Sequence, residues 1–292
     1  MSGQTNTHIA IVGPGAIGGT LAVRLASIAN RTVVVCARTA IAQLILDAPE
    51  GQKTVTPKIL TAPDQAQPVD WILVATKAYD ATAAAGWFQF LTGPHTRLAV
   101  LQNGVEHIER FSAYFPPAKI MPVVVDLPVE RVGPGHFHQR RAGHLTVPAD
   151  ANGEAFRQLF LNTGMEVRLT SDFRSAAWHK LAINCAGAVS AVVLKPAGIS
   201  RQPAVADLMR ALVRECIAVG RAEGAVLDDS LVESVITRYQ SGPADAVNSM
   251  HADHLAGRPM EADVRNGVIV RLGKKHNIPA PINEAIVALL NC

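Results

Sequence analysis

The chain has 292 residues, of which 49% are hydrophobic and 17% are charged, and its formal net charge at pH 7 is +3. This length suits two domains, and the apolar content excludes a disordered chain. The charges are few and scattered, so the sequence argues against a nucleic-acid-binding surface. No apolar run is long enough to span a bilayer, so we also expect no membrane insertion.

The cysteines indicate a reducing compartment. The four cysteines are Cys36, Cys185, Cys216 and Cys292; no two are spaced as a CxxC pair, and three of the four fall inside apolar periodic segments. The N-terminal "MSGQTNTH" lacks the basic start and apolar core of a signal peptide. We therefore expect a cytoplasmic protein with reduced thiols. The ten histidines include His136 and His138, two residues apart in a predicted hairpin, but no carboxylate or cysteine stands near this pair at ligand spacing, so no metal site is predicted.

In chain order, the first part alternates strand-like and helix-like segments. Short runs rich in Val and Ile predict strands at 8–13, 32–37, 70–78, 96–104 and 119–126, with helices at 17–29 and 80–90. Such alternation is typical of a mainly parallel sheet with helices on both faces. The segment 132–148, with its Gly-Pro-Gly and Ala-Gly turns, predicts a hairpin.

The pattern changes near residue 171. A Ser-Asp cap signal opens a helical segment at 171–194, and further helical patterns follow at 204–223, 229–240, 261–276 and 282–290, with a loop at 242–248. We therefore predict an α/β fold in two domains. Residues 1–170 form a doubly wound sheet of mainly parallel strands, and residues 171–292 form an all-α domain.

A glycine-rich loop follows the first predicted strand and opens the first helix. It consists of Gly13, Pro14, Gly15, Ala16, Ile17 and Gly18. In a dinucleotide-binding loop the first glycine permits a tight turn, the second admits the pyrophosphate, and the third allows close packing of helix on strand. The helix N-terminus offers unpaired N–H groups to the phosphates. We predict that all six residues contact a dinucleotide.

Arg38 ends the second predicted strand, where NAD-binding domains carry an acidic residue for the ribose hydroxyls. A guanidinium at this place pairs well with the additional 2′-phosphate of NADP. The sequence therefore favours NADPH as the cofactor, and the alternative for Arg38 is an ordinary exposed arginine in a loop.

Four further polar residues stand where a ligand would be expected. Lys77 and Asn103 follow the carboxyl ends of two predicted strands, and open α/β sheets bind their ligands at that edge. Lys180 and Asn184 are four residues apart and so share one face of a helix. A lysine in a dry cleft can act as a proton donor near neutral pH. The spacing alone equally fits a lysine that extends from an amphipathic helix into water.

Together these motifs resemble the ketopantoate reductase (2-dehydropantoate 2-reductase) family. The similarity is carried, in the family's order, by "GPGAIG" (13–18), Arg38, "TKAYD" (76–80), "LQNGV" (101–105), "WHKLAINC" (178–185), "NSM" (248–250), "MEAD" (260–263) and "NG" (266–267). It covers essentially the whole chain. It implies an NADP-binding Rossmann-type domain over residues 1–170 and a helical substrate and catalytic domain over residues 171–292. It also implies reduction of a 2-oxo acid by NADPH, foremost 2-dehydropantoate to (R)-pantoate.

The resemblance also implies roles for the polar residues. Lys180 would be the general acid and would stabilise negative charge on the substrate oxygen. Asn184 would bind the substrate, and Glu261 would orient the cofactor or the catalytic lysine. Lys77 and Asn103 would lie at the nicotinamide end of the cofactor. Ser249 would hold the substrate carboxylate, or cap a helix that begins near Met250, or do both.

Two positions depart from the family pattern. Ala188 and Ala197 stand where the family usually has substrate-binding asparagines. Three alternatives therefore stay open: an NADPH-dependent reductase of a more apolar 2-oxo acid, an opine or 3-hydroxyacid dehydrogenase that uses His179, and a non-catalytic NADPH-binding regulator. We expect a small-molecule 2-oxo acid as the partner, and the sequence leaves monomer and homodimer equally open.

Overall fold

The computed structural model describes residues 6–292, and the chain forms two compact units. The first contains the chain up to Gln102 together with Glu106–Ser171. The second contains Asn103–Val105 together with Asp172–Cys292. The chain therefore enters the second unit briefly at residue 103, returns to the first, and enters the second again after Ser171.

The first unit is built on a six-stranded parallel sheet in the order β5-β2-β1-β6-β7-β8. This is the strand order of a Rossmann-type doubly wound fold, so the predicted fold class is confirmed. The strands are β1 (Thr7–Val12), β2 (Arg31–Cys36), β5 (Lys58–Leu60), β6 (Val69–Val74), β7 (Thr92–Val100) and β8 (Ile120–Pro122).

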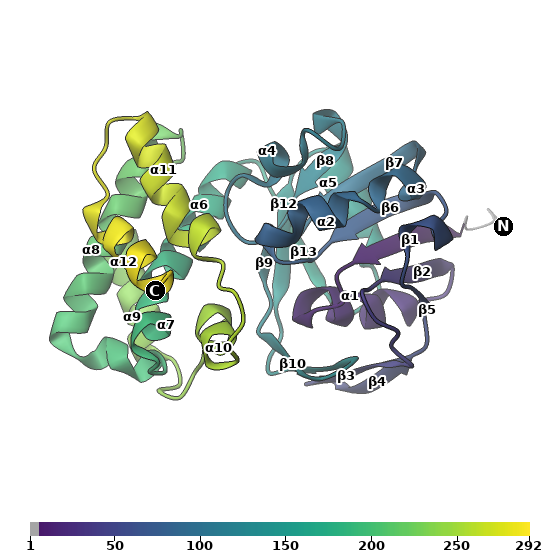
Figure 1. Ribbon diagram of the computed structural model, residues 1–292, viewed down its shortest axis with the longest axis horizontal. Helices are drawn as coiled ribbons and strands as arrows, with labels where there is room; N and C mark the ends of the chain where they lie inside the picture. The colour runs from purple at the N-terminus through teal and green to yellow at the C-terminus, as the bar shows by residue number, and fades with distance from the viewer. Residues whose placement is uncertain (1–5) are drawn as a thin grey trace. The chain divides into compact units, whose positions relative to one another are not determined.

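Helices cover both faces of this sheet (Figure 1). Side chains of a strand alternate between faces, so Ile9 and Ile11 point to one core and Ala10 and Val12 to the other. The first core is closed by α1 (Ala16–Ala26) and α5 (Ala151–Leu159), and the second by α2 (Ala81–Ala85), α3 (Phe88–Leu91) and α4 (His107–Phe111). The predicted helix at 80–90 is thus two short helices.

Two smaller sheets complete the first unit. One has the order β10-β11-β3-β4, and the other has the order β13-β12-β9. Their strands are β3 (Leu44–Ala48), β4 (Gly51–Val55), β9 (Val124–Asp126), β10 (Val129–Gly133), β11 (His136–Gln139), β12 (His144–Pro148) and β13 (Glu166–Thr170). The four-stranded sheet packs on α1 at Gly19, where a Cβ atom would overlap the ring of Phe137.

The hairpin prediction for 132–148 is half right. β10 and β11 form an antiparallel hairpin through Gly133–Gly135, but β12 pairs with β9 and β13 in the other sheet. Gly143 explains the departure, because a Cβ there would lie 2.5 Å from the carbonyl oxygen of Asp126. The Ala-Gly pair therefore brings the chain close to β9 and does not fold it back on β11.

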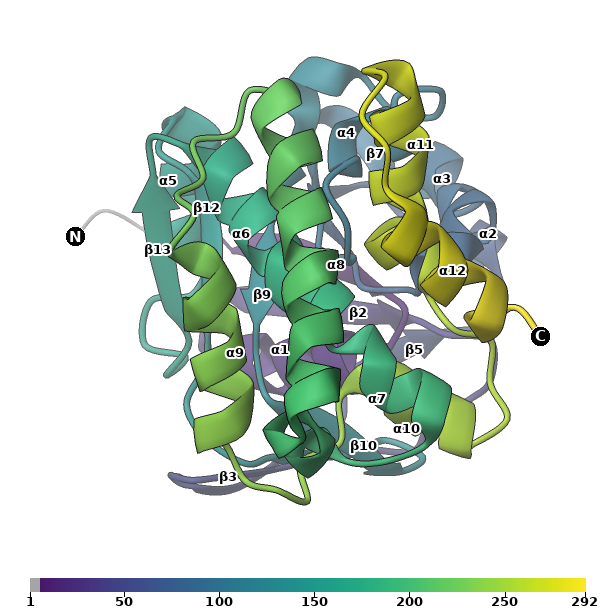
Figure 2. The same ribbon diagram turned by 90° about the vertical axis from the view of Figure 1, so that its left-hand side faces the viewer.

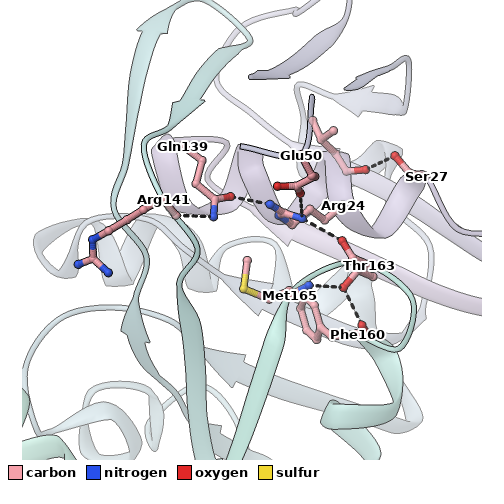
Figure 3. A network of polar contacts seen from close by, with 9 residues as sticks. Arg24, Ser27, Glu50, Gln139, Arg141, Phe160, Thr163 and Met165 are labelled. Carbon is pink, nitrogen blue, oxygen red and sulfur yellow. Dashed lines mark hydrogen bonds and ion pairs between the residues drawn. The ribbon is translucent and has the colours of Figure 1, made fainter. Parts of the chain in front are cut away.

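A buried arginine joins several parts of the first unit (Figure 3). Arg24, in the last turn of α1, is 1% exposed. Its Nη1 is 2.7 Å from Glu50 Oε1 and donates to the Thr163 carbonyl oxygen at 2.9 Å, and its Nη2 donates to Gln139 Oε1 at 2.7 Å. The guanidinium thus connects α1 to the β3–β4 turn, to β11 and to the α5–β13 loop.

The second unit is helical around α8 (Pro203–Ala222), which packs against α6, α9, α11 and α12. Figure 2 shows α8 as a long green helix with α9 on one side and α11 and α12 on the other. The other helices are α6 (Phe173–Ala186), α7 (Ala188–Val193), α9 (Leu231–Ser241), α10 (Ser249–Leu255), the π-helical turn η5 (Asp263–Gly267), α11 (Val268–Lys275) and α12 (Pro281–Leu290). Within residues 6–292 no helix is long and apolar enough to cross a membrane.

The helix signals of this half are largely confirmed. Asp172 caps α6 by accepting from the Ser175 N–H at 3.0 Å, as the Ser-Asp signal predicts. The predicted helix at 171–194 divides at Gly187 into α6 and α7, and the predicted helix at 261–276 combines η5 with α11. Cys36, Cys185 and Cys216 are buried thiols and Cys292 is exposed.

Candidate active site and dinucleotide-binding loop

The glycine loop joins β1 to α1, and each of its glycines has a distinct steric reason. Gly13 has φ +93°, and a Cβ there would lie 2.6 Å from Thr76 Cγ2. A Cβ at Gly18 would overlap the Gly13 carbonyl oxygen. Gly15, in contrast, has open space on its Cβ side, with no atom within 4 Å. The structure therefore needs glycine at 13 and 18 for its own packing, whereas the space at Gly15 can admit a ligand.

The start of α1 fits an anionic ligand. Gly15 is its N-cap and makes no side-chain hydrogen bond, and the first turn carries no acidic residue. The first N–H groups of a helix have no partner within the helix, and the helix dipole favours negative charge there. Pro14, Ala16 and Ile17 complete the loop and are half-buried. The loop thus has the free space and the N–H donors that a dinucleotide phosphate requires.

Arg38 lies at the same edge of the sheet as the glycine loop, beyond the carboxyl ends of β1 and β2. Val12 and Cys36 are paired in register at the ends of β1 and β2, and Arg38 follows two residues later. Its side chain is exposed. A guanidinium therefore stands beyond the second strand, at the place where the sequence predicts recognition of a 2′-phosphate.

Lys77 follows β6 in extended conformation and begins the short turn Ala78–Asp80. Gln102, at the end of the next strand, holds this segment: its Nε2 donates to Thr76 Oγ1 at 2.9 Å and to the Lys77 carbonyl oxygen at 3.1 Å. Arg110 Nη1 donates to Gln102 Oε1 at 3.0 Å. The buried Gln102 is a positioning residue that the sequence analysis missed, although it stands inside the "LQNG" motif.

The second unit gathers polar side chains from distant parts of the chain. Asn103 Nδ2 donates to Glu261 Oε2 at 2.9 Å, and Asn184 Nδ2 is 3.4 Å from Asn103 Oδ1. Glu261 is only 5% exposed, so its carboxylate needs such donors. Lys180 is half-buried and lies one turn before Asn184 on the same face of α6. Three segments of the chain thus supply a carboxylate, two amides and an ammonium group.

The chain matches a known protein family in both units. Residues 9–152 match the family model described as "Ketopantoate reductase PanE/ApbA", and residues 172–292 match the one described as "Ketopantoate reductase PanE/ApbA C terminal". The 2-dehydropantoate 2-reductase of Caulobacter vibrioides is 52% identical over 98% of both chains. The chain belongs to the ketopantoate reductase family. The resemblance inferred from the sequence is therefore confirmed.

Two further relatives extend the similarity. The 2-dehydropantoate 2-reductase of Mycobacterium tuberculosis is 38% identical over 97% of both chains. The solved ketopantoate reductase of Ralstonia eutropha JMP134 superimposes with a TM-score of 0.89, at 30% identity and 97% coverage of each chain. The whole chain, in both units, thus follows the ketopantoate reductase fold.

Within this family fold, Asn103 contacts residues that the sequence did not associate with it. The sequence placed Asn103 with Lys77, because both follow parallel strands. The segment Asn103–Val105 belongs instead to the second unit, where Asn103 bonds to Glu261 and Val105 packs against the helical core. A contact across 158 residues leaves no periodic signal in the sequence. Its role at the nicotinamide end stays a prediction.

The capping prediction for Ser249 is wrong. Asn248 caps α10, because its Oδ1 accepts from the N–H groups of Met250 and His251, both at 3.1 Å. Ser249 is the first residue of the helix, and its Oγ accepts from Arg265 Nη2 at 2.7 Å. Asn is an excellent N-cap, so the cap signal shifts by one residue. The hydroxyl of Ser249 is thereby associated with a cation, and its binding of a carboxylate remains a prediction.

Proposed function

We propose that this protein catalyses the NADPH-dependent reduction of 2-dehydropantoate to (R)-pantoate in the cytoplasm. The observation that carries the proposal is the hydrogen-bonded cluster of Asn103, Asn184 and Glu261, in which Asn184 shares one face of α6 with Lys180. Its polar groups match those that a family of 2-oxo acid reductases requires. The 52% identity to a 2-dehydropantoate 2-reductase supports this substrate, and it does not favour an opine or 3-hydroxyacid dehydrogenase or a non-catalytic regulator.

The first unit would bind NADPH. The open space at Gly15 and the N–H groups at the start of α1 fit the pyrophosphate, and the exposed Arg38 fits the 2′-phosphate. When bound, the nicotinamide supplies the hydride for the substrate carbonyl carbon. Lys77, whose backbone carbonyl oxygen accepts a hydrogen bond from Gln102, is assigned to the nicotinamide end of the cofactor.

The second unit would handle the substrate. Lys180 donates a proton to the carbonyl oxygen of the 2-oxo acid, and its charge stabilises the negative charge that develops there. Asn184, one turn further along α6, binds the substrate. The Glu261 carboxylate accepts a hydrogen bond from the Asn103 amide and so orients the polar groups around the reacting carbonyl. The reaction consumes one proton, which Lys180 provides and then recovers from solvent.

The direct test is a steady-state assay of NADPH oxidation with 2-dehydropantoate, with chromatographic identification of the product. We expect one pantoate per NADPH consumed, and a much lower kcat/KM with NADH. Consumption of NADPH without formation of pantoate would refute the proposal.

A further inference from the structure

Arg265 is a buried arginine without a carboxylate partner. It lies in the π-helical turn η5 and is 4% exposed. Its Nη2 donates to Ser249 Oγ, while its Nε is buried and has no hydrogen-bond partner. Among residues 6–292 no Asp or Glu forms an ion pair with it. Burial of a charge is costly unless the charge is paired, so this guanidinium calls for an anion that the chain itself does not supply.

The other fully buried arginine shows how the same protein satisfies such a group. The Nε of Arg24 is also buried without a hydrogen-bond partner, but a carboxylate, a side-chain amide and a backbone carbonyl, from Glu50, Gln139 and Thr163, surround its two terminal nitrogens. Arg265 has one neutral hydroxyl. The difference points to an external anion that binds reversibly at Arg265.

The setting of Arg265 favours a small substrate anion. Ser249 is exposed, so an anion can reach the hydroxyl to which Arg265 donates. Arg265 is four residues after Glu261, and π-helical turns within helices are frequent at functional sites. Asn248, the residue before Ser249 and the N-cap of α10, donates through Nδ2 to the Gly187 carbonyl oxygen at 2.8 Å. The Arg265–Ser249 pair is thus tied, through Asn248, to the helix junction that carries Ala188.

Ala188 follows Gly187 directly, and it is one of the two positions where the chain lacks a family asparagine. A neutral methyl group cannot bind a polar substrate atom. A guanidinium forms stronger, charge-assisted hydrogen bonds with a carboxylate than an amide does. One buried arginine can therefore replace part of the anchoring that two amides would give.

We propose that Arg265, together with Ser249, binds the carboxylate of the 2-oxo acid and so determines substrate affinity in this chain. The proposal rests on the proposed function for the identity of the substrate. Arg265 is then a binding residue, and it takes over anchoring that Ala188 and Ala197 cannot provide.

The test is calorimetric titration of (R)-pantoate into enzyme saturated with NADP⁺, for the wild type, Arg265→Met and Arg265→Lys. Pantolactone, the ring form that lacks the carboxylate, is titrated beside it. Arg271→Met is the matched control, because Arg271 lies on the following helix, is exposed and pairs with Asp263 at 2.9 Å. Thermal unfolding of each variant is recorded, and turnover of 2-dehydropantoate is measured on the same preparations.

We expect Arg265→Met to raise the Kd of pantoate roughly 10- to 100-fold, the effect of losing a hydrogen-bonded charge pair. The Kd of pantolactone and of NADP⁺ should change less than about twofold, and Arg265→Lys should be intermediate. The thermal midpoint should not fall, since the exchange removes an unpaired buried charge. Arg271→Met should bind pantoate like the wild type.

The inference is overturned if Arg265→Met binds pantoate within twofold of the wild type, if it weakens NADP⁺ instead, or if the wild type binds no pantoate. Turnover separates this result from the fate of the proposed function. Turnover by the wild type with no effect of Arg265→Met removes the inference alone. Pantoate binding that depends on Arg265, without any turnover, removes the reductase function and keeps the carboxylate site.

Discussion

Lys180 is the proposed proton donor in the chemical step. Exchange to Ala removes the proton donor, so we expect kcat to fall by roughly 10²- to 10⁴-fold. The Kd of NADPH should be unchanged within about twofold, because the glycine loop, Arg38 and Lys77 belong to the first unit. The measurement is single-turnover NADPH oxidation, with Lys195→Ala, an exposed lysine of the same unit, as the control. Equal loss of activity in both variants would contradict a specific role for Lys180.

Arg38 is expected to select between the two nicotinamide cofactors. In Arg38→Gln the KM for NADPH should rise roughly 10- to 100-fold, because a charge-assisted contact with the 2′-phosphate is lost. The KM for NADH should stay within about twofold, which makes NADH the internal control. A parallel rise for both cofactors would show that Arg38 acts on the loop and not on the phosphate.

At the scale of single residues, the sequence predicts what depends on local spacing and misses what depends on distant partners. The glycine loop is predictable because Gly13 and Gly18 serve contacts within one strand–loop–helix segment, apart from those with Ala75 and Thr76. The bond between Asn103 and Glu261 joins segments far apart in the chain, and no periodicity reports it. Arg265 was missed because a charged residue in a helical pattern is ordinarily exposed.

Among the elements, α1 depends on its buried arginine. In Arg24→Met the buried Gln139 amide oxygen and the Thr163 carbonyl oxygen lose their donor. Each unsatisfied buried acceptor costs about 1–3 kcal/mol, so we expect the free energy of unfolding to fall by about 2–4 kcal/mol. Urea denaturation measures this, and Glu50→Gln should cost less than Arg24→Met, because Glu50 is 44% exposed and the glutamine oxygen can still accept from Arg24 Nη1. A larger loss in Glu50→Gln than in Arg24→Met would disprove the assignment.

His107, at the start of α4, should make the stability of the first unit depend on pH. Burial, and secondarily the charge of Arg110, lower the pKa of His107 from 6.5 to about 4. The unfolded chain therefore binds the proton first, and stability is lost as the pH falls from 6.5 towards 4. The full effect is roughly 3 kcal/mol, at about 1.4 kcal/mol per pH unit.

The matched variant is His107→Gln, which retains a donor towards the Gln102 carbonyl oxygen that His107 Nε2 contacts at 3.0 Å. Urea denaturation at pH 7, 6 and 5 should show a flatter decline for this variant than for the wild type. An identical decline in both proteins would assign the acid sensitivity to another group.

At the scale of elements, the sequence located most helices and the strands of the six-stranded sheet except β5, but not the small sheets. β3, β4 and β5 were missed because "LILDAPEGQKTVTPKIL" mixes apolar residues with exposed polar ones at strand edges. The predicted strand at 119–126 divides at Val123, where the chain passes from the six-stranded sheet to the three-stranded sheet. Such a change of sheet depends on tertiary packing and leaves no local pattern.

For the whole molecule, a Rossmann-type unit and a helical unit were predictable from the change of pattern near residue 171. The return of Asn103–Val105 to the helical unit was not, because three residues are too few to show a pattern. The chain thus carries the polar cluster of the second unit partly on a segment that follows a strand of the first. Any split of the chain at residue 171 would leave Asn103 out of that cluster.

The most direct test of the central claim compares two substrates that differ by one hydroxyl group. With NADPH, kcat/KM is measured for 2-dehydropantoate and for 3,3-dimethyl-2-oxobutanoate, which has the same carbon skeleton without the 4-hydroxyl. A polar site that binds the hydroxyl rejects the analogue, so we expect a preference of at least about 100-fold for 2-dehydropantoate. Equal or faster reduction of the hydroxyl-free acid would show that Ala188 and Ala197 have moved this enzyme to a more apolar 2-oxo acid.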